Sequence, residues 1–77
     1  MSKYNEDQLK RITTNIKKAC IREYGNTEEA AKQFWYRLIH EVYKINPEAV
    51  PVMIQAQPHP GNKEYMQSIY DELKKQQ

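Results

Sequence analysis

The stretch from Asn26 to Pro47 constrains the fold more than any other part of the chain, because it has the pattern of one amphipathic helix with both ends marked. Its apolar residues recur at steps of three and four, which is the spacing of one helix face. Gly25 interrupts any helix before it, and Asn46 followed by Pro47 ends it. We therefore predict a helix over residues 28–45. Its apolar stripe consists of Ala31, Phe34, Trp35, Leu38, Val42 and Ile45.

Further apolar and aromatic residues, Tyr36, Ile39 and Tyr43, widen this stripe to about half of the helix circumference. A helix that is apolar over so wide an arc is contacted from two sides, so we place it at the centre of the fold. We expect Trp35 to be the most sensitive position, because truncating a buried aromatic side chain costs ~3–5 kcal/mol. His40 lies towards the polar side and is expected to be solvated.

A first helix is predicted over residues 6–24. Asn5 is a favourable N-cap, and Gly25 is the residue that tolerates positive φ after the last turn. The inner stripe of this helix consists of Leu9, Ile12, Ile16, Ala19 and Cys20.

The third helix is expected to be short and interrupted. Asn46 followed by Pro47 has the form of a helix start, so we predict a helix over 47–56. Pro51 lacks a backbone donor and crowds the preceding turn, so we expect a break near it.

A last helix is predicted over 63–74, after a rigid turn at 58–61 and with Asn62 as its cap. Its inner face consists of Tyr65, Met66, Ile69, Tyr70 and Leu73.

No segment alternates with the period of two that marks a strand. The prediction is an all-α fold, a compact three-to-four-helix bundle with a short, proline-interrupted third helix, formed by residues 1–77 as a single helical domain. A chain of 77 residues is close to the size below which one core seldom suffices. Both a monomer and a homodimer therefore remain open.

The composition favours the cytoplasm. A single cysteine, Cys20, cannot form an internal disulfide, whereas small secreted domains usually contain several. No apolar run has the 18 or more residues of a membrane span, and the first residues lack the apolar segment of a signal peptide.

Catalysis is not expected. Cys20 falls on the inner stripe, where a buried and inert thiol is the usual outcome. His40 and His59 are the only histidines, and no short-range pattern of His, Cys or carboxylates has metal-ligand spacing. We predict no enzyme activity, no cofactor and no metal.

The positive charge is concentrated on the first helix. The chain has a net charge of +2, and residues 1–26 alone carry +3. Ile21 falls inside the basic side of this helix, where a bundle does not need an apolar residue. An isoleucine surrounded by cations is typical of a docking surface for an acidic partner. The surrounding basic residues are Lys10, Arg11, Lys17, Lys18 and Arg22.

These features predict a small regulatory protein that acts by protein binding, as an adaptor, an inhibitor or a regulatory subunit. The basic residues around Ile21 are the first candidate surface. Tyr36 and Tyr43, spaced by seven, are the second, because tyrosine is enriched at protein interfaces. The alternative function is nucleic-acid binding through the basic side of the first helix, in which the same cations contact phosphates.

Overall fold

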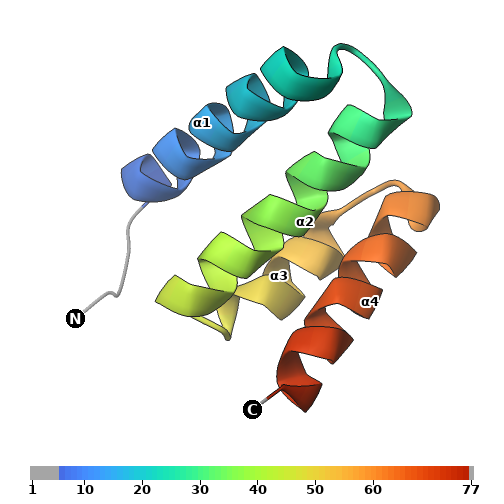
Figure 1. Cartoon of the computed structure of the whole chain (residues 1–77). Helices are drawn as coiled ribbons and strands as arrows, with labels where there is room; N and C mark the ends of the chain where they lie inside the picture. The colour runs from blue at the N-terminus through green and yellow to red at the C-terminus, as the bar shows by residue number, and fades with distance from the viewer. Residues whose placement is uncertain (1–5, 77) are drawn as a thin grey trace.

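The computed structural model describes residues 6–76, and these residues form four α-helices without a strand (Figure 1). The all-α prediction is confirmed. Asn5, the predicted cap of the first helix, lies outside the described residues. The helices are α1 (Glu6–Tyr24), α2 (Glu28–Ile45), α3 (Ala49–Ala56) and α4 (Pro60–Lys75).

The junction between α1 and α2 forms as the sequence indicates. Gly25 adopts a φ of 74°, and its N–H donates to the carbonyl of Ile21 at 2.7 Å, which closes the last turn of α1. Thr27 then caps α2, since its hydroxyl oxygen accepts a hydrogen bond from the N–H of Ala30 at 3.2 Å. These two local devices fix the predicted bounds of both helices.

The third helix differs from the prediction: it begins at Ala49 instead of residue 47, and it has no break at Pro51. Asn46 and Pro47 belong to a turn in which the Asn46 side-chain oxygen accepts from the N–H of Glu48 at 3.3 Å. Pro51 is the third residue of α3. An N–H in the first turn has no partner within the helix, so a proline there removes no hydrogen bond.

The fourth helix also begins earlier than predicted, at Pro60. His59 is the N-cap in place of Asn62, and its Nδ1 accepts a hydrogen bond from the N–H of Asn62 at 3.3 Å. Pro60 fits the first helical position because its φ is already helical and its missing donor would be unpaired there.

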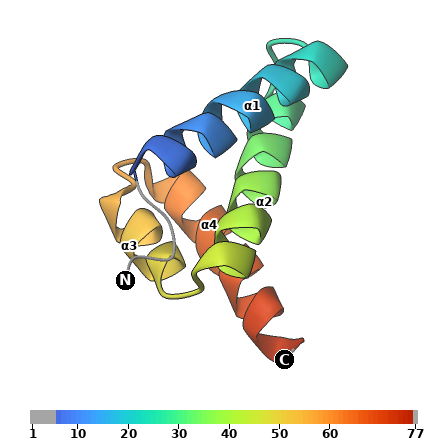
Figure 2. The same ribbon diagram turned by 90° about the vertical axis from the view of Figure 1, so that its left-hand side faces the viewer.

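Helix α2 lies at the centre, as predicted, with α1 on one side and α4 on the other (Figure 1). Helix α3 packs against both α2 and α4 (Figure 2). Among the described helices, the backbone of α1 runs beside α2 alone.

Apart from Cys20 of α1 and Ala30 near the start of α2, the buried apolar side chains come from the second half of α2 and from α3 and α4. Ile39, which the sequence placed at the edge of the apolar arc, is 0% exposed, whereas Ala31 of the predicted stripe is exposed and Trp35 is half-buried. The centre of the core is therefore turned from the predicted stripe towards α3 and α4. The core consists of Leu38, Ile39, Val42, Ala49, Val50, Ile54, Met66 and Ile69.

Candidate protein-interaction surfaces

The basic residues predicted as a binding surface all lie exposed on the outer side of α1, and we call them the basic face. None of them forms an ion pair with a carboxylate in the part of the chain that the structure describes. Their ammonium and guanidinium groups are thus available to an external partner. The basic face consists of Lys10, Arg11, Lys17, Lys18 and Arg22.

Ile21 lies within the basic face and is 47% exposed. A hollow of about 180 Å³ adjoins it at the junction of α1 and α2. Lys17 lies at this hollow, and Ala31 and Phe34 supply apolar surface from α2. Sequence periodicity identified Ile21, but the hollow depends on how the two helices meet.

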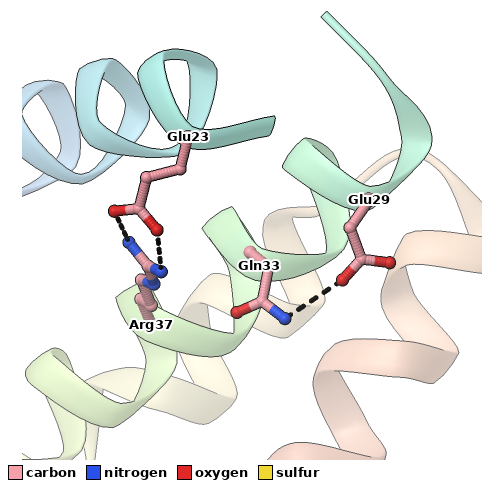
Figure 3. Close-up of polar contacts among 4 residues, drawn as sticks. All are labelled: Glu23, Glu29, Gln33 and Arg37. Carbon is pink, nitrogen blue, oxygen red and sulfur yellow. Dashed lines mark hydrogen bonds and ion pairs between the residues drawn. The ribbon is translucent and has the colours of Figure 1, made fainter. Parts of the chain in front are cut away.

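A bidentate ion pair between Arg37 and Glu23 joins α2 to α1 (Figure 3). The guanidinium of Arg37 donates to both carboxylate oxygens of Glu23, at 3.0 and 3.2 Å. This hydrogen bonding and the positive charge of Arg37 lower the pKa of Glu23, and the same contact raises the pKa of Arg37.

The two tyrosines predicted as a common surface have different environments. Tyr36 is 46% exposed. Tyr43 is half-buried and meets the ring of Tyr70 edge-on, with 6.1 Å between ring centroids. Tyr43 thus packs between α2 and α4, and Tyr36 alone presents a largely open aromatic surface.

His40 is not the solvated surface residue that the sequence indicated. It is half-buried, its ring centroid lies 4.3 Å from that of Tyr36, and its Nε2 is buried without a hydrogen-bond partner among residues 6–76. The packing of α1 and α4 on either side of α2 covers a position that the helix wheel alone leaves in water.

Two clefts adjoin Tyr36 and His40, and no pattern in the sequence indicates either of them. One, of about 430 Å³, lies between α1 and α2 and is lined by Ile12 and Ile16. The second, of about 510 Å³, lies between α2 and α4 and is lined by Tyr65 and Leu73. Their residues come from helices that are distant in sequence, so only the fold brings them together.

Tyr65, in the wall of the cleft between α2 and α4, has a raised pKa. Burial raises the pKa of the Tyr65 hydroxyl, and the neighbouring Glu29 carboxylate and Tyr36 raise it further. Glu29 itself accepts a hydrogen bond from the side-chain amide of Gln33 at 3.1 Å (Figure 3).

The described residues contain no cluster of three or more His, Cys, Asp or Glu side chains able to hold a metal ion. Cys20 is 1% exposed, which keeps its thiol away from solvent. Within the described range, no helix is long and apolar enough to cross a membrane.

Comparison with protein-family models, with curated proteins and with solved structures gives no match for this chain.

Proposed function

We propose that this chain is a non-catalytic protein-interaction module that binds an acidic surface of a partner protein through the basic face of α1. The observation that carries the proposal is the exposure of Ile21, at 47%, among cations that have no ion-pair partner within residues 6–76. Adaptor, inhibitor and regulatory subunit are the roles that such a module serves. The single cysteine favours a reducing cytoplasm as its location.

Ile21 supplies the apolar part of the interaction. Removing its side chain from water stabilises a complex by about 25 cal/mol per Å² of apolar area. The adjoining hollow at Ala31 and Phe34 gives a partner side chain a place to insert. An apolar anchor surrounded by a charged rim is the usual arrangement of an interface centre.

The cations orient the partner protein and raise the rate of association. Lys17, Lys18 and Arg22 surround Ile21 and are exposed. Carboxylates on a partner would meet these groups at the rim, where complementary charge speeds association and disfavours other partners more than it adds affinity.

Nucleic-acid binding through the same cations predicts a different response. Affinity from several phosphate contacts falls by orders of magnitude between low and moderate salt. A phosphate backbone makes no use of an exposed isoleucine, so Ile21 favours a protein partner over a nucleic acid.

The test is an affinity pull-down from a lysate of the producing organism with three forms of the full chain. These are the wild type, Ile21→Asp and Val52→Asp. Val52 is 68% exposed on α3, so its variant introduces the same charge at an apolar surface position away from the basic face. Each form is tested at low and moderate salt, with and without nuclease.

We expect a stoichiometric protein that the wild type and Val52→Asp retain and that Ile21→Asp loses, with nuclease having no effect. Circular dichroism shows whether each variant is folded. If recovery disappears with nuclease or at moderate salt, the basic face binds nucleic acid instead of a protein. If Ile21→Asp is unfolded, Ile21 belongs to the core.

A further inference from the structure

The side of α2 that carries Tyr36 and His40 is a second surface, separate from the basic face. Helices α1 and α4 flank α2 on opposite sides (Figure 1), and α1 and α4 do not pack on each other. The clefts of about 430 and 510 Å³ both include Tyr36 and His40 in their linings, so these two side chains form a ridge between two hollows. We call the ridge and the two clefts the α2 trough.

Each cleft of the α2 trough has apolar side chains in its wall. Ile12 and Ile16 line it from α1, and both are half-buried. Tyr65 and Leu73, also half-buried, line it from α4. A half-buried apolar side chain retains surface that a partner removes from water, and such contiguous surface is typical of interaction sites.

Charge around the α2 trough is mainly negative. Asp71 and Glu72 line its α4 cleft, and Glu29 acts on Tyr65 from the same side of α2. None of these carboxylates has an ion-pair partner in the described residues, whereas Glu41 of the α1 cleft is paired with Lys44. Glu29 and Asp71 each accept a hydrogen bond from an uncharged side-chain amide, that of Gln33 and of Gln67 respectively. The linings also contain two cations: Arg37, which is paired with Glu23, and Lys75, which has no ion-pair partner in the described residues. Asp71 and Glu72 of the lining, with Glu29 nearby, thus outnumber the one unpaired cation.

We propose that the α2 trough is a second docking surface and that its occupant is a lysine-bearing amphipathic helix of a partner protein. A helix lying across the ridge presents apolar side chains at one-turn spacing, which suits the apolar side chains in the two clefts on either side of Tyr36. Its lysines meet Glu29, Asp71 and Glu72. Because the basic face has the opposite charge, the chain can hold an acidic partner and a basic partner at once.

The probe for this test is a synthetic helical peptide of about four turns made of leucine and lysine, with a leucine and glutamate peptide of the same pattern as its charge control. Each is titrated into the isotope-labelled full chain while backbone amide NMR signals are recorded. We expect the lysine peptide to shift the signals of Tyr36, His40 and Glu72, and the glutamate peptide to leave them unchanged.

Variants distinguish binding at the α2 trough from non-specific binding of the peptide. Tyr36→Ala removes an exposed ring, and Glu72→Lys reverses the charge of a lining residue. Each is expected to lower the affinity for the lysine peptide by about tenfold or more. Glu64→Lys makes the same charge reversal at an exposed position of α4 outside both clefts, and it is expected to bind like the wild type. Circular dichroism verifies that all three remain helical.

Three results would overturn the inference. Equal shifts from both peptides would show that charge does not decide binding. Shifts confined to other surfaces would show that the peptide does not bind at the α2 trough. Unlabelled chain that reproduces the shifts at Tyr36 and His40 would identify the occupant as a second copy. This peptide experiment does not involve the basic face, so a negative result would leave the proposed function of α1 unaffected.

Discussion

At the scale of single residues, burial in the fold sets a different order of importance from the sequence pattern. The sequence singled out Trp35, which is half-buried, whereas Ile39 is 0% exposed at the centre of α2. Apolar spacing locates a helix face, but the depth of a residue within that face depends on the angles at which neighbouring helices approach.

Ile39→Ala is therefore expected to lower the free energy of unfolding by about 2–5 kcal/mol, through lost burial and the cavity left behind. The matched change Ile21→Ala removes the same atoms from an exposed position and is expected to cost within about 0.5 kcal/mol. Urea denaturation of both variants measures the difference. Equal costs would contradict the assignment of Ile39 to the core and Ile21 to the surface.

The contact between Arg37 and Glu23 predicts a response to acid. Because the pKa of Glu23 in the folded chain lies below its ordinary value of 4.5, the ionised carboxylate stabilises the fold above pH 4.5. That contribution is lost as the pH falls through the lowered folded-state pKa. The effect is small because both side chains are partly exposed.

An NMR titration of the Glu23 side-chain carboxyl in the wild type and in Arg37→Met checks this reasoning. We expect the midpoint to rise towards 4.5 when the guanidinium is removed. A midpoint unchanged by Arg37→Met would show that the ion pair does not form in solution.

At the scale of helices, the predicted ends of α1 and α2 are correct, and the errors arise at prolines that lie in the first turn of a helix. Gly25 fixed the end of α1, and α2 begins at the predicted residue after the Thr27 cap. Pro51 and Pro60 both lie in first turns, where a missing N–H costs nothing, so the predicted break and the late start of α4 were wrong. The position of a proline within its helix decides its effect, and that position depends on the cap before it.

His59 is the cap that the sequence did not reveal, and its removal is expected to destabilise α4. His59→Ala removes the side-chain acceptor of the Asn62 N–H and should cost about 1 kcal/mol, whereas His59→Asn restores an acceptor and should cost less. Thermal unfolding followed by circular dichroism compares the two. If both variants lose the same stability, the hydrogen bond of His59 is not the source of the effect.

Helix α1 is expected to open before α2. Its backbone runs beside α2 alone among the described helices, and of its inner stripe only Cys20 is fully buried. Native-state hydrogen exchange should give lower protection for amides in α1 than for those around Ile39 and Val42 in α2. Uniform protection along both helices would mean that α1 unfolds only with the whole chain.

At the scale of the whole molecule, the fold presents the basic face on α1 and the α2 trough between α1 and α4. The basic face was predictable, because helical spacing alone places its cations opposite the inner stripe of α1. The α2 trough was not predictable, since Ile12, Tyr36 and Leu73 come together only through the packing of three helices. We propose that a small chain with two such surfaces links two partner proteins.

The most direct test of the central claim is photo-crosslinking in cells of the producing organism. A photoreactive amino acid replaces Ile21 in one form of the chain and Val52, which is more exposed, in a control. We predict a discrete adduct with another protein from position 21 that survives nuclease, and none from position 52. Adducts of equal yield from both positions, or an adduct at position 21 that nuclease removes, would contradict recognition of a partner protein through the basic face.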